Sequence, residues 1–129
     1  MQNDDPRAQL VDCPTRLATE ILSDKWAVLA LFALSRRPRR HGELVDVIGG
    51  VSRKVLTQTL RRLQEYGLVD RRTSGRAVEY SLSEIGETLA EPIEVLTRWA
   101  QDNSAAIVEF QETAEAARAS ASGPRTPQG

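Results

Sequence analysis

The clearest pattern of apolar and polar positions in the chain spans residues 49–67 and predicts a helix. Leu56, Leu60 and Leu63 recur at the spacing of one helical face, while polar side chains fill the other positions. Ser52 is suited to the N-cap, because its hydroxyl can accept a hydrogen bond from a free backbone N–H of the first turn. Glycines at both ends of this stretch allow the tight turns that bracket a helix.

The polar face of this helix differs from an ordinary solvated surface, which mixes charges of both signs. It carries cations and hydrogen-bond donors, with Glu65 as an acid at the far end. Side chains of these types bind the phosphates and base edges of DNA. We therefore predict a DNA recognition helix. The residues assigned to the contact are Arg53, Lys54, Thr57, Gln58 and Arg61.

Three shorter helices are predicted before this one. Residues 14–22 place Leu17 and Ile21 one turn apart, and residues 25–35 are apolar on nearly every side, which is typical of a buried central helix. Residues 41–48 form the third, and a pair of glycines then turns the chain into the recognition helix. Two helices joined by a short glycine-containing turn form a helix-turn-helix unit.

Two segments after the recognition helix alternate as β-strands joined by a tight turn, residues 68–74 and 77–83. A recognition helix followed directly by a short hairpin with arginines near its tip predicts a winged helix. Arg71, Arg72 and Arg76 would then reach phosphates or an adjacent minor groove. The alternative is a solvated basic hairpin without a partner, which the neighbouring recognition helix makes the weaker interpretation.

The last helical region is predicted from Ser83, as its cap, to about Ala117, with Pro92 kinking or splitting it. Its apolar residues follow alternating steps of four and three, which is a heptad pattern. Asn103 fills the one gap in that row, where it would set the register at some cost in stability. The row consists of Leu89, Ile93, Leu96, Ala100, Ile107, Phe110, Ala114 and Ala117, and Ile85, Trp99 and Ala106 lie beside it.

A helix of about 30 residues is about 45 Å long, which exceeds what a domain of this size can cover. We therefore predict a homodimer through this helix and the N-terminal helix; the alternative is a long helix that folds back on its own core after Pro92. The expected fold is mainly α with a small β-hairpin. Its parts are a flexible N-terminus over residues 1–9, a winged helix-turn-helix domain with terminal dimerisation helices over 10–118, and a disordered tail over 119–129.

The charge distribution is asymmetric. The net charge of the 129 residues is −1, yet residues 25–82 hold twelve cations and five acids, a net of +7. A local basic surface of this kind suits groove binding. No apolar run reaches the roughly 18 residues that span a bilayer, and the N-terminus is acidic and unlike a secretory signal, so we expect a cytoplasmic protein without membrane contact.

Residues suited to catalysis or metal binding are scarce in this sequence. The chain has one cysteine, one histidine and no Gly-rich phosphate loop. We therefore expect no cofactor, no metal site and no enzymatic activity. The alternative function that stays open is a winged-helix module for protein–protein interaction, which would show a more mixed recognition face and no salt-sensitive affinity for DNA.

Three stretches together resemble the HxlR-type transcriptional regulators, which are relatives of the MarR group. They read CPTRLATEILSDKWAVLALFALS, RRHGELVDVIGGVSRKVLTQTLRRLQEYGLVDRR and VEYSLSEIGETLAEPIEVLTRWA, and the resemblance covers residues 13–103. It implies a bacterial, dimeric winged-helix protein that binds double-stranded DNA and controls transcription, often of neighbouring genes. We expect a repressor, and a dimer would recognise a pseudo-palindromic operator through two successive major grooves.

Matched by position, the residues assigned above to the recognition helix and the wing correspond to those of the family. Ser52 also matches a residue of the family's recognition helix, which adds it to the expected DNA contacts. Arg40 matches a basic residue that directly precedes the helix at residues 41–48. His41 departs from the pattern, because the family usually has an aromatic residue there, most often phenylalanine, that packs the helix-turn-helix unit on the central helix. A neutral histidine can pack in the same way; the alternative is a pH-sensing role.

Cys13 is a candidate redox sensor, since some members of this family sense oxidants or electrophiles through a cysteine near this place. With Pro14 at the first helical position, the Cys13 thiol would lie at a helix N-terminus with Arg16 nearby, an environment that favours the thiolate. A lone cysteine can form an intersubunit disulfide, a sulfenic acid or a mixed disulfide. The alternative is a small buried apolar residue.

A small-molecule effector is a further hypothesis. A cleft between the central helix and the dimerisation helices would be lined by Trp26, Leu29, Leu96 and Trp99. The alternative is that these side chains simply pack against one another.

Overall fold

The computed structural model describes residues 14–121, which divide into two units after Ile93. The first unit holds every element up to the first turn of the last helix. The second, from Glu94 onward, is the remainder of that helix. None of the helices within residues 14–121 combines the length and the apolar character that a membrane span requires.

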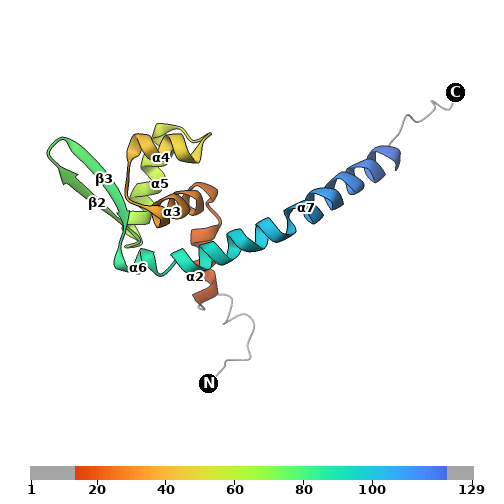
Figure 1. Cartoon of the computed structure of the whole chain (residues 1–129), viewed down its shortest axis with the longest axis horizontal. Helices are drawn as coiled ribbons and strands as arrows, with labels where there is room; N and C mark the ends of the chain where they lie inside the picture. The colour runs from red at the N-terminus through yellow and green to blue at the C-terminus, as the bar shows by residue number, and fades with distance from the viewer. Residues whose placement is uncertain (1–13, 122–129) are drawn as a thin grey trace, which may run out of the picture. The chain divides into compact units, whose positions relative to one another are not determined.

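The predicted succession of helices and a hairpin is confirmed, as Figure 1 shows. The fold is a mainly helical winged helix-turn-helix with a small antiparallel sheet and a long C-terminal helix. In chain order the elements are α2 (Pro14–Leu22), α3 (Lys25–Arg36), β1 (Arg39–Arg40), α4 (His41–Ile48), α5 (Arg53–Glu65), β2 (Val69–Ser74), β3 (Ala77–Leu82), α6 (Glu84–Glu87) and α7 (Ala90–Ala121).

Helix α3 is central to the first unit and packs against α2, α4, α5 and β3. It begins where the Asp24 carboxylate accepts hydrogen bonds from the backbone N–H groups of Trp26 and Ala27, at 3.0 and 3.3 Å. The sequence pattern predicts burial on nearly every side of α3. Leu29 is 40% exposed, however, so burial covers only one side of this helix. The buried residues of α3 are Ala27, Ala30, Leu31, Ala33 and Leu34.

A third strand extends the predicted hairpin into a sheet of order β1-β3-β2. Strand β1 pairs Arg39 with Tyr80 and Arg40 with Glu79, antiparallel to β3. The sequence does not predict this strand, because two residues are too few for an alternating pattern. Its pairing joins the start of α4 to the middle of strand β3.

The turn between α4 and α5 requires its glycines. Gly49 and Gly50 have φ angles of 70° and 82°, a backbone conformation that other residues rarely adopt. Immediately after the turn, the Ser52 hydroxyl accepts a hydrogen bond from the Val55 backbone N–H at 3.1 Å and caps α5. The fully buried Leu44 of α4 completes the packing of this helix pair on α3, which confirms the helix-turn-helix unit.

The last helical region splits before Pro92. Helix α6 ends at Glu87 and α7 begins at Ala90, so Pro92 lies in the first turn of α7, where its missing N–H leaves no helical bond unmade. Helix α7 continues to Ala121. Residues 119–121, which the sequence analysis assigns to the tail, are therefore helical.

Within residues 94–121, taken by themselves, no side chain is buried. The Asn103 side-chain amide donates a hydrogen bond to the Trp99 backbone carbonyl at 2.9 Å, inside the same helix. The large exposed apolar residues of this segment are Val95, Leu96, Trp99, Ile107, Val108 and Phe110.

Gly86 of α6 packs directly against the backbone that leads into β2. A Cβ atom added to Gly86 would lie 2.0 Å from the carbonyl oxygen of Leu68. The same carbonyl accepts a hydrogen bond from the Ser83 backbone N–H at 3.0 Å. Because a paired backbone group has little freedom to move aside, only glycine fits at this position.

We predict that Gly86→Ala lowers the free energy of unfolding by about 3 kcal/mol, since the added methyl group overpacks the core. Urea denaturation followed by circular dichroism measures the change. Gly42→Ala is the matched control: a Cβ atom at Gly42 meets nothing within 4 Å, so this substitution inside α4 should stabilise by up to about 1 kcal/mol. Equal stability of the two variants would contradict the close contact at Gly86.

Candidate nucleic-acid interface

The two sides of α5 differ in burial. Leu56, Leu60 and Leu63 are at most 1% exposed and lie in the hydrophobic core. All the residues that the sequence assigns to the contact on this helix lie on its exposed side. They are Ser52 at the cap and Arg53, Lys54, Thr57, Gln58 and Arg61 within the helix.

The cations of this exposed side carry no counter-ion within residues 14–121. The ion pairs of that part of the chain include Arg37–Glu43 and Arg62–Asp24, whereas Arg53, Lys54 and Arg61 form none. Unpaired cations on one surface produce a positive potential that attracts phosphates. The charged groups of Arg53, Lys54 and Arg61 are therefore available to bind a polyanion.

A cleft of about 510 Å³ lies between α5 and the hairpin β2–β3. Two predicted contact residues of the helix and one predicted wing residue line the same cleft, so guanidinium groups flank it from both elements. Such a cleft matches an anionic group better than a neutral one. Its lining residues are Thr57, Arg61, Gln64, Glu65, Arg71 and Tyr80.

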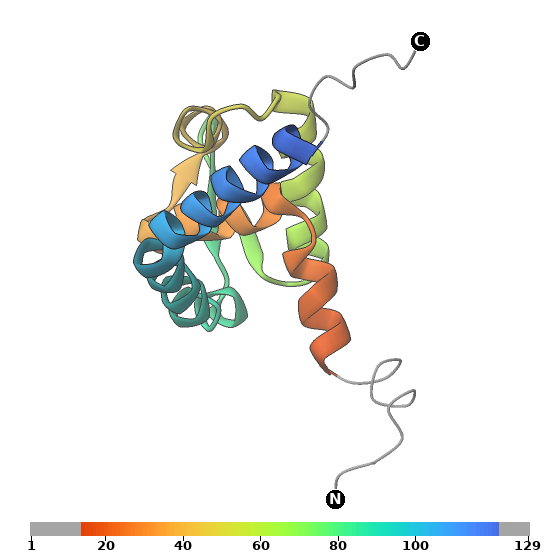
Figure 2. The ribbon, with the colours of Figure 1, turned by 90° about the vertical axis from the view of Figure 1, so that its right-hand side faces the viewer.

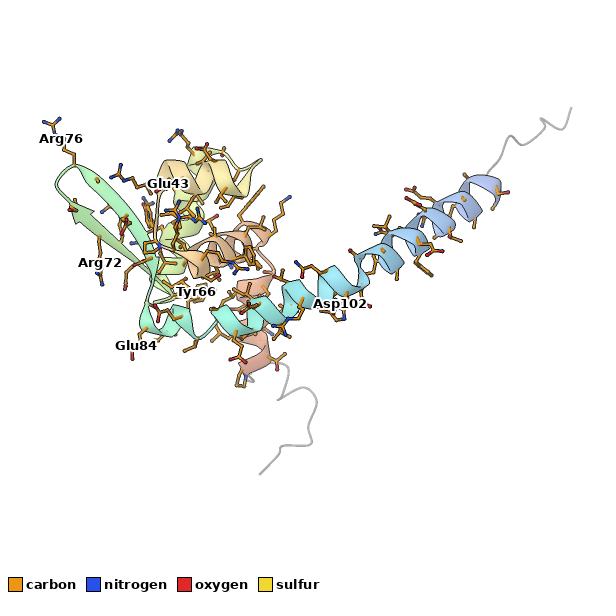
Figure 3. All side chains as sticks on the ribbon, in the orientation of Figure 1. Glu43, Tyr66, Arg72, Arg76, Glu84 and Asp102 are labelled. Carbon is orange, nitrogen blue, oxygen red and sulfur yellow. The ribbon has the colours of Figure 1, made fainter. Side chains whose placement is uncertain are left out.

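The three wing arginines are not equivalent. Arg71 lies opposite Tyr80 in the strand register, on the side of the hairpin that carries the buried Val69. Arg72 lies opposite Glu79 on the other side. Arg76 follows the turn at the tip; Figure 3 shows it projecting from the end of the hairpin, and Arg72 from its side. All three side chains are exposed.

Arg40, the remaining predicted contact residue, lies at the N-cap of α4. Its backbone N–H donates to the Glu43 carboxylate at 2.9 Å, and Arg37 donates to the same carboxylate at 3.0 Å. These contacts, the backbone bond first, hold the pKa of Glu43 below its usual value. The Arg40 side chain is exposed, and its backbone pairs with Glu79 in the middle of β3.

Arg62 is a cation of α5 that turns toward the protein. Its guanidinium donates to the backbone carbonyl of Glu20 in α2 at 3.2 Å and pairs with the Asp24 carboxylate at 3.4 Å. Figure 2 shows the end of α2 beside α5. The sequence gives no signal for these contacts, because the partners lie 38 and 42 residues away.

His41 forms a second contact that sequence reasoning missed. Its Nε2 atom lies 2.9 Å from the Thr57 hydroxyl, so the first residue of α4 is bonded to the exposed side of α5. The departure from an aromatic residue at this position is the one signal in the sequence that pointed to it.

The four predicted effector residues are divided between the two units, Trp26 and Leu29 in the first and Leu96 and Trp99 in the second. Trp26 lines a cavity of about 220 Å³, whose other walls are Asp24, Val55, Gln58, Thr59 and Arg62. Leu29 is exposed and lines no part of that cavity. Leu96 and Trp99 belong to the segment 94–121, where both are exposed.

Cys13, the redox candidate, lies outside the described residues. Its neighbour Pro14 is the first residue of α2, as the sequence predicts. Among residues 14–121, no three histidine, cysteine or acidic side chains are grouped so that they could hold a metal ion.

The profile of the HxlR-like helix-turn-helix family matches residues 21–107. The HTH-type transcriptional regulator YkvN of Bacillus subtilis (strain 168) is 37% identical over 90 residues, which cover 67% of this chain and 76% of YkvN.

Solved structures agree in fold. The transcriptional regulator ytfH from Salmonella typhimurium superposes with a TM-score of 0.69 at 32% identity, over 78% of this chain and 93% of that one. The redox regulator HypR in its oxidized form superposes with a TM-score of 0.66 at 26% identity, over 70% of this chain and 97% of HypR.

Proposed function

The chain belongs to the HxlR-like helix-turn-helix family of transcriptional regulators, which are not enzymes, and we propose that it is a dimeric, sequence-specific repressor. In this proposal the exposed side of α5 enters the major groove of duplex DNA, and the hairpin β2–β3 contacts the phosphate backbone of the adjacent DNA. The DNA-binding surface consists of Arg40, Ser52, Arg53, Lys54, Thr57, Gln58, Arg61, Arg71, Arg72 and Arg76.

The observation that carries this proposal is the set of exposed, unpaired cations on one side of α5. Arg53, Lys54 and Arg61 stand there with the amide of Gln58, opposite the buried leucines of the same helix. Arginine and lysine bind guanine O6 and N7, and glutamine binds adenine N6 and N7. Glu65, at the far end, is the one acid of α5, whereas a helix that needed only solubility would carry charges of both signs on its exposed side.

Exposed apolar residues on the terminal helices support the dimer. Leu96, Trp99 and Phe110 are 51, 56 and 74% exposed on α7, and Leu17 is 51% exposed on α2. Such side chains favour burial against a second copy of the chain. Two copies related by a two-fold axis would present two α5 helices about one helical turn of DNA apart, and a dimer seated on a promoter blocks the polymerase.

We also propose that Cys13 makes DNA binding sensitive to oxidants. HypR, a redox regulator, has the same fold. Cys13 precedes α2, whose last turn is bonded to α5 through Arg62, so a displacement of α2 would reach the DNA-binding surface. Two Cys13 thiols from two chains would form a disulfide, giving two protons and two electrons to the oxidant. A small-molecule effector, with Trp26 at its site, is the alternative signal.

We predict that α5 and wing variants lose DNA affinity differently on an operator selected from a random duplex pool. Arg53→Ala and Arg61→Ala should each relax base preference, at about 1–3 kcal/mol per contact. Arg72→Ala and Arg76→Ala should weaken binding to all DNA sequences alike. They should also reduce the slope of log affinity against log salt concentration by about 1. Fluorescence anisotropy at several salt concentrations measures both effects, and Arg98→Ala, exposed on α7, is the matched charge control.

Unchanged selectivity in the two α5 variants would contradict the assignment of base contacts. A wild-type protein that bound no duplex in a salt-dependent way would favour the protein–protein module instead.

We predict that Phe110→Asp converts the dimer to a monomer, because the apolar row would then have to bury a carboxylate. Analytical ultracentrifugation measures the mass of each variant. Gln111→Asp introduces the same charge one residue away from the row and should leave a dimer. A dimeric Phe110→Asp protein would show that the subunits meet elsewhere.

We predict that diamide releases the wild-type protein from its operator and leaves the Cys13→Ser variant bound, since serine forms no disulfide. The same anisotropy titration, with and without oxidant, tests this. If the variant were released as readily as the wild type, Cys13 would have no sensing role.

A further inference from the structure

Thr57 lies on the exposed side of α5, and two hydrogen bonds engage its hydroxyl group. Thr57 Oγ1 donates to the backbone carbonyl of Arg53 at 2.9 Å. His41 Nε2 lies 2.9 Å from the same hydroxyl oxygen. A carbonyl oxygen can only accept, and a hydroxyl has a single hydrogen, so that hydrogen belongs to the bond with Arg53. The Thr57 oxygen is therefore the acceptor of the second bond, and the His41 Nε2–H is its donor.

This bonding leaves the Thr57 hydroxyl no hydrogen to offer a DNA base. The bond to the preceding turn also holds the χ1 rotamer, as back-bonded threonines in helices do. The group that Thr57 retains for the major groove is its methyl group. A hydroxyl that both donates and accepts suits several bases, whereas an apolar methyl group selects the methyl group of thymine.

We propose that Thr57 selects a thymine in each operator half-site through contact between the two methyl groups, and that His41 is the positioning residue for this contact. The inference rests on the proposed entry of α5 into the major groove. His41 is the first residue of α4, so its bond joins the two helices of the helix-turn-helix unit. A phenylalanine at this position packs but donates no hydrogen bond. The thymine contact therefore depends on the histidine at position 41 of this chain.

Replacing thymine by uracil in the operator tests the contact, because uracil lacks only the 5-methyl group. With wild-type protein, one position in each half-site should lose affinity about fourfold on this replacement, the equivalent of one buried carbon group. Thr57→Val keeps a methyl group and should keep this sensitivity. Thr57→Ser keeps the hydroxyl, lacks the methyl group and should bind the thymine and uracil operators equally.

The role of His41 has its own variant. His41→Phe keeps an aromatic ring and removes the donor. The Thr57 hydroxyl then keeps only its bond to the Arg53 carbonyl, so its rotamer is held less tightly and the sensitivity to uracil should fall below about twofold. A thermal unfolding curve confirms that the variant is folded. If His41→Phe only lowered stability, it would weaken binding to the thymine and uracil operators equally. A ratio of the two affinities equal to the wild-type ratio would therefore overturn the positioning role.

The outcomes separate this inference from the proposed function. Wild-type protein that binds its operator but is indifferent to uracil at every position overturns the inference and leaves the DNA-binding proposal standing. A Thr57→Ser protein that keeps the sensitivity, or a Thr57→Val protein that loses it, also overturns the inference. Failure of the wild type to bind any duplex overturns both.

Discussion

The burial of three leucines along one side of α5 is the constraint on which the functional surface depends. Leu56, Leu60 and Leu63 are at most 1% exposed, and burying each is worth about 2 kcal/mol. Turning α5 about its axis would expose them, so the core determines which side of the helix meets solvent. The cations lie on that side because the leucines lie on the other. The burial of the leucines therefore determines the direction in which the DNA-binding side chains of α5 point.

Contacts at the edges of α5 then hold the surface in place. Asp24 caps α3 and also pairs with Arg62, so one carboxylate links the central helix to α5. The bond from His41 to Thr57 connects α4 to the exposed side of the same helix. Strand β1 pairs with β3 and so ties the wing to the entry of α4. Every element of the first unit that touches the proposed DNA surface is joined to another by hydrogen bonds.

The features that could be predicted from the sequence are those written in local patterns. The helices from α2 to α5 and the hairpin follow from periodicity, the cap at Ser52 and the glycine turn before it, all readable within a few residues. The distant hydrogen-bond partners of Arg62 could not be predicted, because the sequence around Arg62 does not indicate Glu20 or Asp24. Strand β1 could not be predicted for a related reason. Its two residues are too few to show an alternating pattern, and they form a strand only because they pair with β3. The exposure of Leu29 depends on which neighbours α3 has.

In the proposed complex, the exposed side of α5 lies in the major groove, and two copies of the protein bind each operator. Dimethyl sulfate footprinting probes this placement, because the reagent methylates guanine N7 in the major groove and adenine N3 in the minor groove. We expect two blocks of protected guanine N7 atoms about 10 base pairs apart, which shrink in the Arg53→Ala protein. Protection of adenine N3 alone, or no protection within a bound site, would contradict this placement.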